Sequence, residues 1–133
     1  ASLFVVGLGS CSYPYALRAT VLDGRIAIIV DPSSQRRPQC FESIQVMVDL
    51  LSPDLDARGD TYWRQVAATG SCSNLFPALY GAPMKDVLPD SSQVAAKPLR
   101  LGVIYHVGTT SGGSGYGAGR FTITSDRRIQ NLD

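Results

Sequence analysis

Lysine and glutamate are nearly absent from this sequence. Of its eleven acidic residues only Glu42 is a glutamate, and of its twelve basic residues only Lys85 and Lys97 are lysines. Because these two residue types populate the exposed faces of helices, their scarcity argues against a largely helical protein. The chain has 13 glycines and 8 prolines instead, a composition that suits short strands joined by frequent turns.

Charge and long apolar runs are also scarce. Charged residues make up 17% of the 133 residues and the net charge is +1, which argues against a domain that grips a nucleic-acid backbone. No apolar run approaches the roughly 18 residues of a membrane span, so we expect a soluble chain without one. With 44% hydrophobic residues the chain can build a core, and its length suits a single domain over residues 1–133.

The apolar pattern predicts about seven strands and little helix. An Asp23-Gly24 pair between two β-prone runs predicts a type I′ hairpin whose second strand is central and buried on both sides. Residues 41–51 fit a strand or a helix, and their β-branched residues favour the strand. We expect a single antiparallel β-sandwich or jelly-roll-like barrel. The predicted strands are residues 3–8, 17–22, 25–30, 41–51, 61–69, 99–107 and 120–124.

Two segments of the sequence do not alternate as strands do. Residues 75–98 contain four prolines and predict a long irregular segment. Residues 108–119 contain six glycines and predict a mobile hairpin tip, on which the aromatic ring of Tyr116 would contact a partner.

His106 is the only histidine of the chain. On the strand predicted for residues 99–107 it lies on the face opposite the apolar set, so we expect a surface or interface histidine. Tyr105 and His106 are candidates for contact with a partner molecule. The alternative is a small enzyme in which His106 acts with a cysteine or an aspartate.

The three cysteines are widely spaced along the chain. An odd count at such spacing is unlike the dense disulfide framework of small secreted proteins and predicts reduced thiols. The alternative is one bridge, for which Cys11 and Cys72 are the candidates because both lie in a Gly-Ser-Cys-Ser tetrapeptide; Cys40 would then be free.

The loop 54–60 carries two patterns with chemical meaning. Asp54, Asp56 and Asp60 stand at the first, third and seventh positions of a calcium-loop pattern, and Gly59 at the sixth. Arg58 at the fifth position and Gln65 at the twelfth depart from that pattern. The same loop spells Arg58-Gly59-Asp60, the tripeptide of integrin ligands. Calcium is thus the one cofactor candidate, and a solvated turn is the default interpretation.

The composition and turn pattern of the whole chain resemble those of the coat-protein domains of small icosahedral RNA viruses, especially the protruding domains of nodavirus-like and tombusvirus-like coats. The resemblance is carried by the Asp23-Gly24 hairpin, by Asp54 and Asp56, and by the many Gly, Ser, Thr and Pro residues in the loops. It implies a non-enzymatic domain on the virion surface that self-associates, most simply as a dimer, and contacts a host protein or glycan.

A glycan-binding β-sandwich module is a second alternative. It requires Tyr62, Trp63 or Tyr80 to lie exposed in a shallow groove, because sugar rings stack on open aromatic faces. Buried aromatics at these positions would argue against it.

Overall fold

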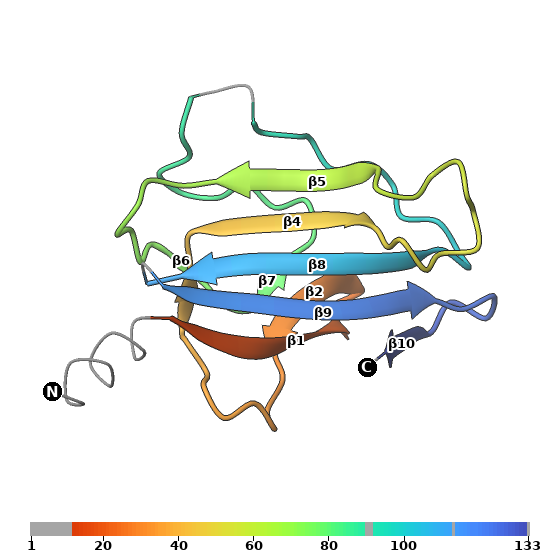
Figure 1. The fold of residues 1–133 in the computed structure, drawn as a ribbon, viewed down its shortest axis with the longest axis horizontal. Helices are drawn as coiled ribbons and strands as arrows, with labels where there is room; N and C mark the ends of the chain where they lie inside the picture. Colours follow the sequence, from red (N-terminus) through yellow and green to blue (C-terminus); the bar gives the residue numbers. More distant parts are fainter. Residues whose placement is uncertain (1–11, 90–91, 113, 133) are drawn as a thin grey trace, which may run out of the picture.

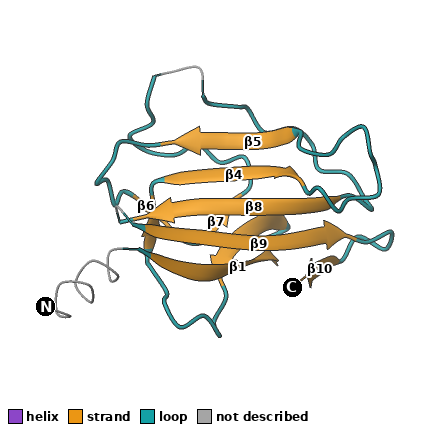
Figure 2. Cartoon of the chain, viewed as in Figure 1, coloured by secondary structure: helices purple, strands orange, loops and turns teal. Residues whose placement is uncertain are grey.

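The computed structural model describes residues 12–89, 92–112 and 114–132. These residues contain no helix, and about half of them lie in strands (Figure 2). The strand predicted for residues 3–8 lies outside the described residues. The strands are β1 (Tyr13–Leu22), β2 (Arg25–Val30), β3 (Cys40–Phe41), β4 (Ser43–Val48), β5 (Thr61–Val66), β6 (Asn74–Leu75), β7 (Ala78–Leu79), β8 (Ile104–Ser111), β9 (Gly115–Ile123) and β10 (Ile129–Leu132).

Eight of these strands form one curled sheet. Its order is β5-β4-β8-β9-β1-β2-β7, and β10 pairs with β9 beside β1. Strands β5, β4, β8, β9 and β1 lie side by side in Figure 1, and β2 and β7 lie behind them. The pairing of β1 with β9 is parallel, so the prediction of a purely antiparallel sheet is wrong. This pairing joins segments about a hundred residues apart, and no local pattern indicates its direction.

The predicted hairpin is confirmed. Strands β1 and β2 pair from Leu17↔Val30 to Leu22↔Arg25, and Asp23 and Gly24 have φ values of 50° and 76°, as a type I′ turn requires. Strand β2 is internal, because β7 pairs with its other edge.

Strand β4 confirms the strand interpretation for residues 43–48 of the predicted span 41–51, and residues 49–51 lie in the loop that follows. Its side chains alternate between the core and the opposite face, with Ile44, Val46 and Val48 fully buried. They belong to a single hydrophobic core that joins β4, β8 and β9 to β1, β2 and β7. The largest fully buried side chains of this core are Trp63, Tyr105, Phe121 and Ile28.

The strand predicted for residues 99–107 begins later than the alternation indicates. Residues 99–103 are not in a strand, and Leu101 and Gly102 form a turn. Gly102 has a φ of 78°, and its N–H donates to the carbonyl of Ile123. Leu101 is consequently half exposed, and β8 begins at Ile104. Residues 129–132, which are outside the predicted strands, form β10 against β9.

The prediction of a glycine-rich tip over residues 108–119 is wrong. Strand β8 continues to Ser111 and β9 begins at Gly115, so the connection is short. The glycines of β9 are required by close packing: a Cβ at Gly115 would lie 2.6 Å from Tyr13, and one at Gly117 would lie 2.3 Å from Tyr15. Glycine here makes room for tyrosines that cross the strand, an arrangement also used in designed sheets.

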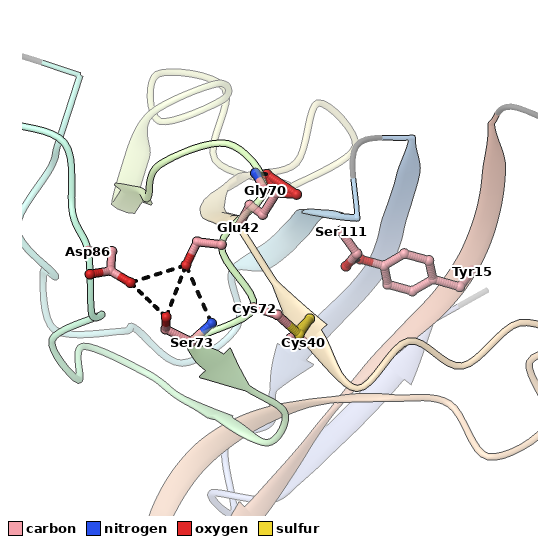
Figure 3. Close-up of a disulfide and its surroundings, with 9 residues drawn as sticks. Tyr15, Cys40, Glu42, Gly70, Cys72, Ser73, Asp86 and Ser111 are labelled. Atoms are coloured by element: carbon pink, nitrogen blue, oxygen red, sulfur yellow. Dashed lines mark hydrogen bonds between the residues drawn. A yellow bond between two sulfur atoms is a disulfide. The ribbon is translucent and has the colours of Figure 1, made fainter.

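A disulfide joins Cys40 to Cys72 (Figure 3). The prediction of reduced thiols is therefore wrong for these two cysteines. The alternative of a Cys11–Cys72 bridge is also wrong. The antiparallel pairing of β3 with β6 brings their Cα atoms to 5.4 Å, within the usual range for a bridge. Cys11 lies outside the described residues. The loop before β6 is further held because the Gly70 N–H donates to the Glu42 carboxylate.

Candidate binding surfaces

Strands β4, β8 and β9 have one face that points away from the core. On β8, the buried residues Tyr105 and Val107 alternate with His106 and Gly108, which are partly exposed. We call this surface the outer face; in Figure 1 it lies on the side away from β2 and β7. Its members are Ser43, Gln45, Met47, His106, Gly108, Thr110, Tyr116, Ala118 and Arg120.

A hollow of about 320 Å³ opens at the edge of the outer face, where β1 leaves β9. The last β1–β9 pair is Ala16↔Ala118, and β10 pairs with β9 up to Leu132↔Arg120. Asn131 bridges the fork, since its side chain donates to the carbonyl of Ala19 and accepts from the Ala19 N–H. We call this space the fork hollow; Arg18, Asp31, His106 and Arg120 contribute its ionisable lining.

Among the described residues, the charged side chains that line the fork hollow are those of Arg18, Arg120 and Asp31. His106 lies directly opposite Arg120 on the neighbouring strand. The Asp31 carboxylate accepts hydrogen bonds from the N–H and hydroxyl of Ser33. These bonds, followed by the charge of Arg18, hold the pKa of Asp31 below its ordinary value, so Asp31 is ionised at neutral pH.

Two further hollows share His106 with the first. One, of about 240 Å³, is lined by the polar side chains of Ser43, Gln45 and Thr110 among others, and we call it the polar hollow. The other, of about 280 Å³, is mainly apolar and lies between His106, Met47 and Leu50. His106 therefore stands where three shallow depressions meet, which confirms its prediction as a surface histidine.

Four exposed leucines occupy two loops at one end of the sheet. Leu50, Leu51 and Leu55 lie in the β4–β5 loop, Leu101 lies before β8, and their exposed fractions are 69%, 66%, 69% and 50%. We call these four residues the leucine end. The loops are bonded to each other, because the Asp49 N–H donates to the Ile104 carbonyl and the Ile104 N–H donates to the buried Ser52 hydroxyl.

The predicted calcium residues lie in the same β4–β5 loop. Asp54 faces Arg100 at 3.6 Å, and its carboxylate accepts a hydrogen bond from the Asp56 N–H. Asp56 and Asp60 are exposed. In residues 12–89, 92–112 and 114–132, no group of three or more His, Cys, Asp or Glu side chains gathers around a point that could hold a metal ion. The calcium site stays a prediction from the sequence alone.

The Arg58-Gly59-Asp60 tripeptide forms the turn that leads into β5. Gly59 has a φ of 83° and its N–H donates to the Val48 carbonyl, while the Val48 N–H donates to the Asp60 carbonyl. Arg58 donates from Nε to the Ser52 carbonyl at 2.8 Å. The tripeptide thus holds the β4–β5 loop to the end of β4. Leu50, Leu51 and Leu55 belong to the same loop.

The aromatic candidates divide between core and surface. Tyr105 is fully buried, so its side chain is not available for the partner contact that the sequence predicted. Tyr62 and Trp63 are also buried, and the Tyr80 hydroxyl donates to the Lys97 carbonyl, which argues against a glycan groove built on these three rings. Tyr116 is the exception: it is 51% exposed on the outer face.

Sequence reasoning missed Arg18 and Arg120 as site residues. They belong to strands that lie far apart in the sequence, and their neighbourhood follows only from the parallel β1–β9 pairing. An isolated arginine in a β-prone run carries no signal that could have indicated the fork hollow.

Comparisons with known protein families, with curated proteins and with solved structures found no significant match for this chain. In the part of the chain that the structure describes, no helix is long and apolar enough to cross a membrane.

Proposed function

We propose that this protein is a non-enzymatic structural and binding domain that associates with a second copy of itself through the leucine end. The observation that carries the proposal is the exposure of Leu50, Leu51, Leu55 and Leu101 on two loops that are hydrogen-bonded to each other. Exposed apolar side chains held on a rigid platform are typical of interaction sites.

The charges around the leucine end favour a second copy over a lipid surface. Arg58 and Arg100 alternate there with Asp54 and Asp56, so the rim carries both signs. In a two-fold contact each patch meets itself, and a mixed rim lets a cation of one copy face an acid of the other. An anionic membrane would instead favour an excess of cations.

Within this class we favour a projecting domain of an icosahedral virus coat, with its outer face turned to the host. The sheet curls so that β2 and β7 lie behind β8 and β9 around one hydrophobic core, and we relate this half-barrel to the sandwich of such domains. The Cys40–Cys72 disulfide is typical of virion surfaces and other oxidising environments.

The enzyme alternative is weakened for a nucleophile supplied by Cys40 or Cys72. Cys40 and Cys72 are bonded to each other and offer no thiolate nucleophile to His106. Asp31 lines the fork hollow together with His106, so an aspartate partner is the version to test. A reaction that His106→Gln abolishes without changing self-association would favour the enzyme.

Light scattering coupled to size exclusion, over a range of concentrations and with or without calcium, tests the proposed self-association. We expect a dimer that Leu50→Asp and Leu101→Asp convert to monomer, because each introduces a charge into the contact. Val21→Asp is the matched control, since Val21 lies in β1 at the Asp23-Gly24 hairpin and is 53% exposed against 50% for Leu101.

Three outcomes decide between the versions of this proposal. A strict monomer at every concentration would contradict self-association. A dimer that resists both leucine variants would place the contact elsewhere. Calcium-dependent association would support the calcium site predicted at Asp54, Asp56 and Asp60.

A further inference from the structure

We propose that self-association is reciprocal, with Leu51 of each copy seated in a hollow on the other copy. The receiving space is the mainly apolar one of about 280 Å³ beside His106, and we call it the apolar hollow. It is lined by Met47, Val48, Asp49, Leu50 and His106. The inference rests on the proposed association through the leucine end, and it names the two surfaces that meet.

Leu51 projects from a turn that is hydrogen-bonded at both ends. Its N–H donates to the carboxylate of the buried Asp49 at 2.8 Å, and the Ser52 N–H donates to the Asp49 carbonyl. The Asp49 N–H donates to the Ile104 carbonyl, and the Ile104 N–H donates to the Ser52 hydroxyl. Leu51 is 66% exposed on this ordered backbone, so covering it with a partner costs little further backbone entropy.

The apolar hollow lies beside this turn, at the end of the sheet where β4 ends and β8 begins (Figure 1). Met47 of β4 pairs directly with His106 of β8, and Leu50 forms part of the wall. Leu51 follows Leu50 in the chain but does not line the hollow of its own molecule.

The apolar hollow has room for one leucine side chain. A cavity of about 150 Å³ already admits a benzene molecule, which is larger than a leucine side chain. The flexible thioether of Met47 can adapt its shape to such a side chain.

The size of a stable contact favours an extension of the leucine end onto this hollow. A specific interface removes about 800 Å² of surface from each partner and takes about 20 residues of each. The four residues of the leucine end are too few, so a stable contact must continue onto neighbouring surface. Because Leu50 belongs both to the leucine end and to the wall of the apolar hollow, the two form one continuous apolar surface.

Two-fold symmetry favours a second copy as the occupant of the apolar hollow. Leu51 and the hollow lie side by side on one molecule, so a two-fold axis between them seats both leucines at once. The rim residues Arg100 and Asp54 carry both signs of charge, as contact with a copy of the same surface requires. A lipid chain or a small apolar molecule would fill the hollow but leave Leu51 in water.

Disulfide cross-linking between two variants tests this reciprocal contact. Leu51→Cys and Met47→Cys are made separately, each with Cys11→Ser and with the Cys40–Cys72 disulfide retained, and the two proteins are mixed under mild oxidation. We expect cross-linked dimer in the mixture and almost none in either variant alone, because a disulfide requires Cα atoms within about 7 Å. The mixed dimer keeps one native contact, between Leu51 of one chain and Met47 of the other.

Dissociation constants of leucine variants measure the same contact in solution. Leu51→Ala should weaken the dimer about tenfold or more, because a side chain that fills a pocket at an interface is a hot spot. Leu55→Ala is the matched control, since Leu55 has a comparable exposed fraction of 69%. It should weaken the dimer less than about fivefold.

The two methionines of the chain provide a second matched pair. Met47→Trp fills the apolar hollow and should weaken the dimer about tenfold or more. Met84→Trp makes the same change in a hollow beside β6 and β7 and should alter association less than about twofold. Circular dichroism and thermal unfolding confirm that each variant is folded, and the cross-linking result decides if Met47→Trp is not.

The possible results separate the reciprocal contact from self-association as such. A wild-type protein that stays monomeric at every concentration would overturn both. A wild-type dimer in which Leu51→Cys cross-links to itself, or in which the mixture gives no cross-link, would keep self-association and overturn the reciprocal contact. Binding to neutral phosphatidylcholine vesicles that Met47→Trp abolishes would assign the apolar hollow to a lipid chain instead.

Discussion

Strands β8 and β9 are rich in glycine on both faces of the sheet, and the two faces differ in how closely other residues pack against those glycines. On the inner face, Gly117 and Gly119 leave no space for a Cβ, because Tyr15 and the backbone of Leu17 lie against them. On the outer face, a Cβ at Gly108 would meet only ordinary contacts at 3.7 Å or more. The inner glycines are structural requirements, whereas the outer one is not.

This difference separates the residues that hold the fold from those that are free to bind. The inner face also carries a buried hydroxyl group, since Tyr15 bonds to Thr109 and Ser111 at 2.6 and 2.5 Å. Figure 3 shows Tyr15 beside Ser111. Such a satisfied polar contact fixes the register of β1 against β8 and β9. The outer face has no comparable constraint at Tyr116 or Gly108, so substitutions there are expected to change binding before they change stability.

The largest expected effect comes from removing an aromatic ring from the inner face, compared with the same change on the outer face. Phe121→Ala empties a fully buried position beside Tyr105 and should lower the free energy of unfolding by about 3–5 kcal/mol. Tyr116→Ala on the outer face should change it by about 0.5 kcal/mol or less. Urea denaturation measures both values, and Phe121→Leu serves if the alanine variant does not fold. Similar losses for Phe121→Ala and Tyr116→Ala would contradict the division between faces.

A smaller effect is expected from adding one methyl group. In Gly119→Ala the new Cβ would lie 2.3 Å from the Leu17 carbonyl oxygen, so backbone must move, at a cost of about 1–3 kcal/mol. Gly108→Ala has space and should be neutral or stabilise by up to about 1 kcal/mol, because alanine restricts the unfolded chain. Thermal and urea unfolding of the pair checks this, and an equal loss in both variants would show that the outer face is packed as tightly as the inner one.

The smallest effect is expected at alkaline pH. Burial raises the pKa of Tyr105 to about 12, above its unfolded value of about 10. Its contribution to stability is therefore complete below about pH 10 and is lost as the pH rises toward 12, because the unfolded state releases the phenolic proton first. We expect a loss on the order of 1 kcal/mol by about pH 11.

Unfolding curves between about pH 8 and 11 measure this loss. Tyr105→Phe should make the profile less steep by this amount, and the rest of the slope belongs to Tyr80 and Tyr15, whose pKa values burial also raises. An unchanged slope in Tyr105→Phe would assign the alkaline loss to those two tyrosines.

Local sequence predicted the parts of the fold that depend on neighbouring residues. The Asp23-Gly24 turn follows from backbone conformations that few residue pairs adopt, and the alternation of Ile44, Val46 and Val48 follows from a sheet with one buried face. The strand predicted for residues 61–69 forms over Thr61–Val66.

The same reasoning failed where distant segments meet. The glycines of β9 indicate a flexible tip when they are considered alone, because their reason is the rings of Tyr13 and Tyr15 a hundred residues earlier. The alternation from Leu99 onward indicates a longer strand than forms, since Gly102 turns the chain toward Ile123.

The sequence by itself determined an all-β chain with its central hairpin and a surface-facing His106, because composition, turn chemistry and period-two alternation act over a few residues. Only the tertiary structure decided that Cys40 meets Cys72, that β1 runs parallel to β9, and that Arg18 and Arg120 share a hollow with His106. These are pairings between remote segments, and their free energy comes from burial that exists only after the sheet has curled around its core.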